Sequence, residues 1–144
     1  MHVVYELEAR KRCWFMDSEG LVYDGRGSRT SEKSGYAHTL LSGLQDGGRD
    51  SKSLENMVNV LKPTCMIGVS TMRGAFTEQV IGLMCEFNEH PIVLALSNPT
   101  SKSECTAEEA YRFSKGKAVF ASGSPFEARR HRSMWSIQKK ARTS

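Results

Sequence analysis

The sequence lacks the cysteine and histidine spacing that a zinc site or a disulfide framework requires. Its 144 residues include four cysteines and four histidines, but no CxxC motif and no histidine at metal-ligand spacing. It also has no apolar stretch long enough to span a membrane, and its opening residues, MHVVYELEARKRC, lack the apolar core of a signal peptide. These absences argue against a disulfide-rich secreted domain or a membrane protein, and they favour reduced thiols in a cytosol-like compartment.

The chain has little excess charge outside its C-terminal end. The formal net charge is +4, from 20 Lys and Arg against 16 Asp and Glu. Six of the basic residues lie from residue 129 onward, where no acid occurs, so 14 bases face 16 acids in the rest of the chain. The sequence therefore divides into a slightly acidic body, residues 1–128, and a basic tail, residues 129–144, that we expect to be disordered. An arm that binds nucleic acid or an acidic partner is the less favoured alternative for the tail.

Four short apolar runs in the body are typical of strands that are buried on both faces. The runs are Cys13–Met16, Cys65–Val69, Ile92–Leu96 and Ala118–Ala121. Helices are predicted to end near residue 12, to follow Ser53, and to begin at the N-caps Thr77 and Thr106, the last with Glu109 in a capping box. Residues 24–52, rich in Gly, Ser, Arg and Asp, are predicted to be a long surface loop. This alternation predicts an α/β fold with a parallel sheet.

In an open parallel sheet, ligands bind beyond the carboxyl ends of the strands. These ends carry small or polar residues here: Asp17-Ser18, Val69-Ser70-Thr71, Ser97-Asn98-Pro99 and Ser122-Gly123-Ser124-Pro125. Such residues let a ligand approach, although loops of this kind are rich in them in any case. The carboxylate of Asp17 suits the two hydroxyls of an adenosine ribose. The alternative is a turn aspartate that accepts the amide of Glu19 or Gly20.

Three segments resemble malic enzyme, in the order and at the spacing of that family. They are CWFMDSEGLV, LKPTCMIGVS followed by GAFTEQVIGLMCEFNEHPIVLALSNPTSKSECTAEEAY, and KAVFASGSPF. The resemblance covers Cys13 to Phe126, and SNPTSKSECTAEEAY followed by FASGSPF is its most specific part. It implies part of a Rossmann-like NAD(P)-binding domain, an incomplete parallel sheet of about four strands. Malic enzymes oxidatively decarboxylate L-malate to pyruvate and carbon dioxide.

The resemblance also implies roles for residues at the strand ends. Asp17 would lie at the adenosine ribose, and Val69 and Ser70 would line the cofactor. Ser97 and Asn98 would lie where the nicotinamide meets the substrate. The amide of Asn98 can donate to a malate carboxylate or to the nicotinamide carbonyl. We therefore expect Asn98 to contact both cofactor and substrate.

Cofactor choice follows from two further positions. Ser18 and Lys33 resemble those of the NADP-preferring members, since the extra phosphate of NADP requires hydroxyls or cations. NADP is therefore expected over NAD, with Arg26 and Arg29 as alternative phosphate ligands. Members of the family also use a divalent metal, Mg²⁺ or Mn²⁺, as a Lewis acid.

The sequence departs from the family in two ways. Thr71, Met72 and Arg73 replace small residues that let backbone approach the cofactor, and we expect them to impair binding. The family's Gly-rich phosphate turn, its catalytic Tyr and Lys, and its Glu/Asp/Asp metal ligands lie upstream of the matching segments, and Tyr5 and Lys11 do not stand in their motifs.

We therefore expect an enzyme fragment that contributes part of a cofactor site and is inactive alone. The alternative is a noncatalytic truncated isoform that binds nucleotide weakly or docks on full-length subunits through an exposed sheet edge. A cytoplasmic location is expected, or a mitochondrial or plastid one if a targeting segment precedes these residues.

Overall fold

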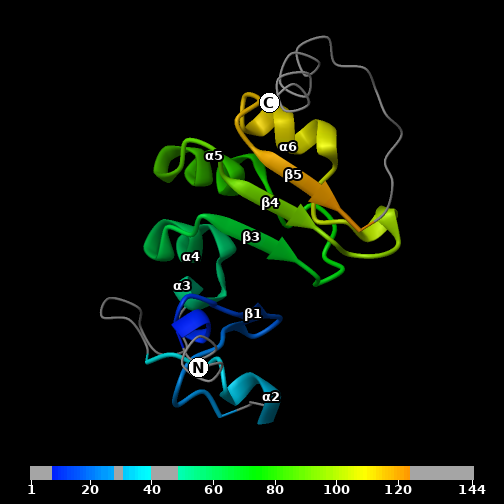
Figure 1. Cartoon of the computed structure of the whole chain (residues 1–144). Coiled ribbons are helices and arrows are strands. Elements are labelled where there is room, and N and C mark those ends of the chain that lie inside the picture. The colour runs from blue at the N-terminus through cyan, green and yellow to red at the C-terminus, as the bar shows by residue number, and fades with distance from the viewer. Residues whose placement is uncertain (1–7, 28–30, 40–48, 124–144) are drawn as a thin grey trace.

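The computed structural model describes residues 8–27, 31–39 and 49–123, and it shows two small sheets with helices packed beside them (Figure 1). The elements are β1 (Met16–Asp17), β2 (Gly20–Leu21), α2 (Ser31–Ser34), α3 (Arg49–Lys52), α4 (Leu54–Leu61), β3 (Cys65–Gly68), α5 (Glu78–Phe87), β4 (Ile92–Ala95), the 3₁₀ helix η1 (Thr100–Lys102), α6 (Ala107–Phe113) and β5 (Val119–Ser122). Residues 8–11 are also helical, in agreement with the helix end predicted near residue 12. The predicted basic tail lies outside the described residues.

The larger sheet is parallel and has the strand order β3-β4-β5. Cys65 pairs with Ile92, and Ile92 pairs with Val119, so the three strands are in step. Helix α5 connects β3 to β4, and α6 connects β4 to β5. The fold is therefore a small α/β unit with a parallel sheet, an incomplete Rossmann-like arrangement, as predicted.

The helices begin where the sequence places their caps. The hydroxyl of Ser53 accepts from the amide of Asn56 at the start of α4, and the hydroxyl of Thr77 accepts from the amide of Val80 at the start of α5. At α6 the capping box is complete, because Thr106 accepts the Glu109 amide while the Glu109 carboxylate accepts the Thr106 amide. These side chains satisfy amides that have no partner within the first helical turn.

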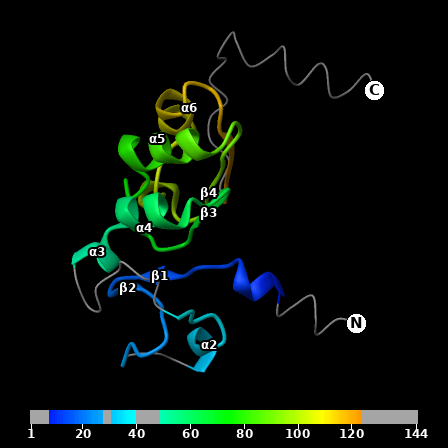
Figure 2. The same cartoon turned by 90° about the vertical axis from the view of Figure 1, so that its left-hand side faces the viewer.

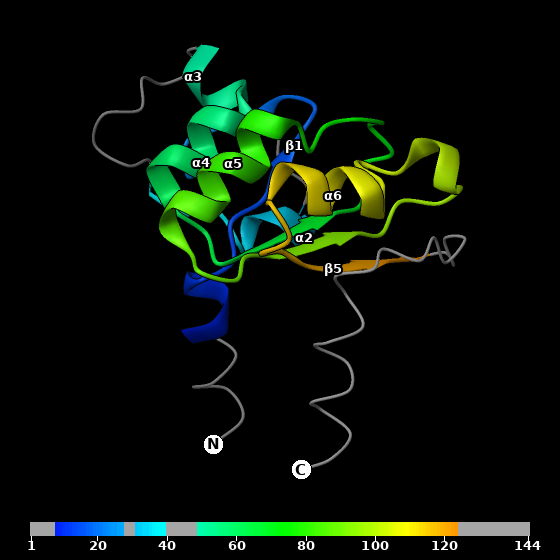
Figure 3. The same cartoon turned by 90° about the horizontal axis from the view of Figure 1, so that it is seen from above.

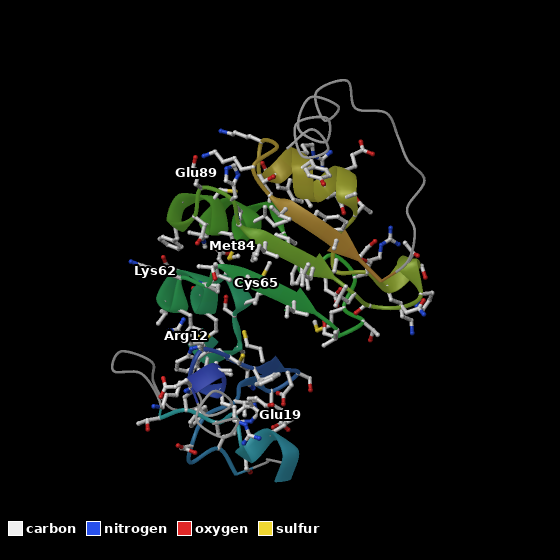
Figure 4. All side chains as sticks on the ribbon, viewed as in Figure 1. Arg12, Glu19, Lys62, Cys65, Met84 and Glu89 are labelled. Carbon is white, nitrogen blue, oxygen red and sulfur yellow. The ribbon has the colours of Figure 1, made fainter. Side chains whose placement is uncertain are left out.

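Helices α4, α5 and α6 lie on the same face of the parallel sheet (Figures 2 and 3). The core between them and the strands includes Val80, Ile81, Met84, Val93 and Ala110, all almost fully buried. Figure 4 shows Met84 on α5 beside the sheet. Because crossovers in parallel sheets are right-handed and the strand order follows the chain order, successive connecting helices reach the same face.

The opposite face of the sheet is exposed in the described structure, although the sequence predicted strands buried on both faces. Ile67, Val69 and Val119 are 58%, 72% and 55% exposed, and Ile92 also contributes to this face. Helices α4, α5 and α6 all lie on the other face of the sheet (Figure 3), so no described element covers these side chains. The prediction of burial holds only for the alternate residues that point toward the helices, such as Met66, Val93 and Ala95.

The first predicted strand is not part of the parallel sheet. Residues Met16 and Asp17 pair antiparallel with Leu21 and Gly20, so β1 and β2 form a hairpin with a two-residue turn. Gly20 has φ +105°, a backbone conformation that glycine adopts without steric cost. Leu21 is almost fully buried against Met57 of α4, which gives the returning strand its own apolar anchor. Among the described residues, the parallel sheet thus has three strands rather than the predicted number of about four.

The segment predicted as a long surface loop, residues 24–52, is more structured than expected where it is described. It contains α2 and α3, and Tyr23 just before it forms a bridge with His38. The ring of His38 stacks on Trp14 with centroids 3.9 Å apart. Ser51 of α3 is buried against the hairpin, because its carbonyl lies beside Gly20. Thus α3 and α4 hold the hairpin next to β3, on the side away from β4 (Figures 1 and 2).

Candidate functional site: the carboxyl edge of the parallel sheet and the Asp17 hairpin

Two serines lie side by side just beyond the carboxyl ends of β3 and β4. The ladder continues past the named strands, since the amide of Leu96 donates to the carbonyl of Gly68 at 2.8 Å. This register brings the loop that begins at Ser70 next to Ser97, whose hydroxyl accepts from the amide of Thr71 at 2.8 Å. The structure therefore brings the predicted cofactor residues of two different strands together at one edge.

The residues of this edge differ in exposure. Ser97 is buried, whereas Val69, Ser70 and Asn98 are exposed. A buried serine can fix the backbone, while an exposed serine and amide remain available to a ligand. The edge can thus present Ser70 and Asn98 to a bound molecule, on a base that Ser97 helps to hold.

Beneath this edge lies a carboxylate that the sequence did not single out. Glu104, between η1 and α6, is fully buried. Its Oε1 accepts from the Ser97 hydroxyl at 2.5 Å, from the Ser70 amide at 3.0 Å and from the Ser70 hydroxyl at 3.2 Å. Burial disfavours the charged form, but these donors outweigh it, so the pKa of Glu104 lies below its usual value. The side chain is therefore an ionised acceptor under the strand ends.

The loop after β3 carries the three residues predicted to intrude on a cofactor. Thr71 has φ 57°, in the left-handed region, and its hydroxyl donates to the carbonyl of Ser70 at 2.7 Å. Thr71, Met72 and Arg73 are all exposed, Met72 by 60%. Their bulk therefore lies at the surface of the site, and their effect on binding stays a prediction.

Asp17 lies at the end of β1, in the second part of the site. Both of its carboxylate oxygens accept from the guanidinium of Arg26 at 2.8 Å, and Oδ2 also accepts from Lys33 at 2.5 Å. Oδ1 accepts the amide of Glu19 at 2.9 Å. The turn role proposed as the alternative for Asp17 is therefore present in the structure. A carboxylate offers about four lone pairs as hydrogen-bond acceptors. The four hydrogen bonds to Asp17 therefore use all of them.

Charge and burial together set the ionisation of this cluster. Partial burial opposes the charged form of Asp17, but the hydrogen bonds from Arg26 and Lys33 outweigh it, so the pKa of Asp17 lies well below its usual range. The same pairing raises the pKa of Arg26 above its ordinary value. Asp17 is thus a carboxylate across the neutral pH range.

The two cationic side chains that bind Asp17, Arg26 and Lys33, differ in exposure and in their number of contacts. The Arg26 side chain is 9% exposed and also donates to the carbonyls of Gly20 and Leu21, so it braces the hairpin. Lys33, from α2, is 42% exposed and makes its contact through one ammonium group. Ser18 lies exposed in the turn of the hairpin. Because Arg26 also binds the hairpin backbone, the side chain of Lys33 is the one that can turn toward a bound anion. Arg29, the other predicted phosphate ligand, lies outside the described residues.

The remaining candidates for chemistry are few. In residues 8–27, 31–39 and 49–123, no three His, Cys, Asp or Glu side chains gather closely enough to hold a metal ion. All four cysteines are free, and burial raises the pKa of Cys105 to about 12. Among the described helices, none is long and apolar enough to cross a membrane.

Comparison with known proteins agrees with this arrangement. The family model described as "Malic enzyme, NAD binding domain" matches residues 2–138. The chain belongs to the malic enzyme family. It is 51% identical over 119 residues to the NADP-dependent malic enzyme of Mus musculus, and 49% identical over 120 residues to that of Homo sapiens. It is also 47% identical over 125 residues to the mitochondrial NADP-dependent malic enzyme of Homo sapiens.

The alignments cover 83% to 87% of this chain but only 19% to 20% of these three malic enzymes. The chain thus spans about a fifth of the length of the curated relatives it matches. The match of the family model also extends past residue 126, where the resemblance seen in the sequence stopped, into the basic segment. The described residues therefore form part of an NAD(P)-binding domain of malic enzyme type, and the candidate site lies within that part.

Proposed function

We propose that this chain supplies part of the NADP site of a decarboxylating malate dehydrogenase. The observation that carries the proposal is the meeting of Ser70 and Ser97 at the carboxyl ends of two neighbouring parallel strands, in a chain of the malic enzyme family. Ligands of open α/β sheets bind at such edges. NADP supplies the hydride acceptor of the reaction, and the residues of this edge bind and orient it.

The hairpin cluster gives a physical basis for NADP rather than NAD. Asp17 already accepts four hydrogen bonds, so a ribose hydroxyl competes with Lys33 for Oδ2. A 2′-phosphate resolves this competition, because Lys33 can leave Asp17 for the phosphate and free one oxygen of the carboxylate. Ser18, exposed beside Asp17, adds a hydroxyl donor. The NADP-dependent relatives support the same choice.

Lys33→Ala tests the cofactor choice, with Lys52→Ala, a solvent-exposed lysine of α3, as the matched control. Titration of the chain with NADP⁺ and with NAD⁺ gives two dissociation constants for each variant. We expect at least about a tenfold loss of the NADP⁺ preference for Lys33→Ala, since a charge-assisted hydrogen bond contributes about 1.5–3 kcal/mol. An unchanged ratio would refute the assignment of Lys33.

Asn98 is the proposed contact between this chain and the substrate. It is exposed at the end of β4, next to the buried Ser97, so its amide can donate to a malate carboxylate or to the nicotinamide carbonyl. The divalent metal of the reaction, Mg²⁺ or Mn²⁺, would polarise the 2-oxygen of malate. We propose that its ligands come from outside the described residues, in which no three-ligand cluster occurs.

We propose that the 144 residues alone do not turn over malate. Formation of NADPH can be followed by absorbance at about 340 nm, with malate, NADP⁺ and Mn²⁺ present. We expect no turnover but measurable NADP⁺ binding by calorimetry. Robust turnover would refute the proposed inactivity, and an absence of any NADP⁺ binding would refute the proposed cofactor role.

The exposed apolar face of the parallel sheet favours a second candidate function, docking on a full-length malic enzyme subunit. Exposed apolar side chains lie on or next to three neighbouring strands, at Ile67, Val69, Ile92 and Val119, and β5 leaves one edge of the sheet without a neighbour among the described strands. Co-purification of the chain with a full-length subunit would support docking, and Val119→Lys should weaken it. A cytoplasmic location and an absence of nucleic-acid binding remain predictions.

A further inference from the structure

Among the residues whose side-chain burial the structure describes, Glu104 is the only acidic or basic one that is buried. Its hydrogen-bond donors are neutral: one backbone amide and two serine hydroxyls. Burial of a carboxylate is costly unless hydrogen bonds or opposite charges compensate for the lost water. A carboxylate kept at such a position needs an explanation beyond the packing of the core.

The contacts of Glu104 join its own segment to the loops that follow β3 and β4, at the carboxyl edge of the parallel sheet. Its side chain binds Ser70 after β3 and Ser97 after β4. Its backbone carbonyl accepts the amide of Phe76 at 3.2 Å, so the loop from β3 to α5 is held near both of its ends. Ser97 extends the connection, because it donates to Glu104 and accepts from the amide of Thr71. The exposed loop is therefore held at its start by the carboxylate of Glu104 and near its end by the backbone carbonyl of the same residue.

Gly68 makes room for this carboxylate within the sheet. A Cβ at residue 68 would lie 2.5 Å from Cδ and 2.6 Å from Cγ of Glu104, well inside contact distance. The absence of a side chain at the last residue of β3 thus lets Glu104 reach under both strand ends. The second oxygen, Oε2, is buried and has no hydrogen-bond partner among the described residues. The three hydrogen bonds from Ser70 and Ser97 all converge on Oε1.

We propose that Glu104 is a positioning residue, which holds Ser70 and Ser97 together and so fixes the β3–α5 loop in the form that receives the nucleotide. The inference rests on the proposed NADP site and adds a residue to it that does not itself touch the ligand. A role in global stability alone would be served as well by an apolar side chain, which carries no desolvation cost. The donors of Glu104 instead all belong to the strand ends at the proposed site.

Two substitutions separate the reach of the side chain from its charge. Glu104→Asp keeps the charge but is one methylene shorter, so it cannot keep the contacts with both serines. Glu104→Gln keeps the length and an acceptor in the place of Oε1. The matched controls are Glu108→Asp and Glu108→Gln, because Glu108 lies four residues away on the exposed side of α6.

The first measurement needs no ligand. Amide hydrogen exchange of the full 144-residue chain reports on Ser70 and Thr71 in the loop and on Val93 in the core. We expect Glu104→Asp to speed exchange at Ser70 and Thr71 by at least about tenfold relative to Val93, since each amide loses or loosens its acceptor. Glu104→Gln should show a smaller change. Equal acceleration at all three amides, or none, would overturn the positioning role.

The second measurement is NADP⁺ affinity at a temperature where each variant is fully folded by circular dichroism. We expect binding to weaken in the order wild type, Glu104→Gln, Glu104→Asp, with at least about a tenfold loss for the last. Wild-type affinity in folded Glu104→Asp would overturn the proposal. If the wild-type chain binds no NADP⁺, the proposed function fails and with it the binding half of this proposal, while the exchange data still decide whether Glu104 orders the loop.

Discussion

Replacement of Gly68 by alanine is the sharpest test of how the strand ends are packed. The new Cβ would lie 2.5 Å from Cδ, 2.6 Å from Cγ and 2.7 Å from Oε2 of Glu104. Ordinary contact begins at about 3.4 Å, so the side chain must move by about 0.9 Å. It has little freedom to do so, because it is fully buried and its Oε1 accepts three hydrogen bonds.

The size of the effect follows from these contacts. Overpacking of a well-packed interior costs about 1–3 kcal/mol, and loss of a hydrogen bond to a charged group costs about 1.5–3 kcal/mol. Partial relaxation makes the two losses less than additive, so we expect Gly68→Ala to lower the free energy of unfolding by about 2–4 kcal/mol.

The control is Gly82→Ala in α5, where a Cβ meets nothing within 4 Å. Since alanine favours a helix interior over glycine, this variant should be more stable than wild type by about 0.5–1 kcal/mol. Urea unfolding followed by circular dichroism gives both differences. A Gly68→Ala variant within about 0.5 kcal/mol of wild type would show that Glu104 is not held against residue 68. The double variant Gly68→Ala/Glu104→Ala should lose less than the sum of the two single losses, because the clash is then relieved.

Three further predictions concern the frame of the site. Thr106→Ala removes the N-cap of α6 and half of its capping box with Glu109, and should cost about 1 kcal/mol in urea unfolding. Because the pKa of Asp17 is lower in the folded state, the stability it contributes is present above about pH 4 and is lost as the pH falls further; Asp17→Asn should flatten this acid limb in pH-dependent melting. Met84→Ala should cost about 2–5 kcal/mol from a fully buried position, whereas Val60→Ala, at a position on α4 that is 44% exposed, should cost less than about 1 kcal/mol.

The sequence predicted the parallel part of the fold well because its signals there are local. The caps Ser53, Thr77 and Thr106 lie directly before amphipathic helices, and the apolar runs of β3, β4 and β5 are short and separated by those helices. Hydrophobic periodicity and capping depend on residues only a few positions apart, so they can be read without knowledge of the tertiary structure.

The hairpin was missed because its second strand is only two residues long and pairs locally. The signal was present: Ser18 and Glu19 form a two-residue turn before Gly20, and an apolar run, Leu21 to Tyr23, follows at once. Such a pair of apolar runs around a short turn indicates a hairpin. Reading Met16 as the end of a parallel strand gave the correct place for Asp17 at a strand end, but the wrong sheet.

The sequence predicted which residues lie at the carboxyl ends of β3 and β4, but it did not single out Glu104 beneath them, and the cofactor role of these residues stays a prediction. Strand ends identified Ser70, Ser97 and Asn98, since these positions follow directly from the fold class. Glu104 gave no such signal, because it lies in a polar stretch between η1 and α6 and its partners are 34 and 7 residues away in the chain. A glycine at the end of a strand that leaves room for a distant side chain becomes visible only once the tertiary structure is known.

The two crossovers of the parallel sheet are equal in length, and this bears on the order in which the sheet forms. Residue 65 pairs with residue 92, and residue 92 with residue 119, so each pairing closes a loop of 27 residues. Closure entropy depends on loop length, so length alone favours neither half. Synthesis breaks this symmetry, because β3, α5 and β4 leave the ribosome before α6 and β5 do. We therefore expect β5 to pair last, on the free edge of β4.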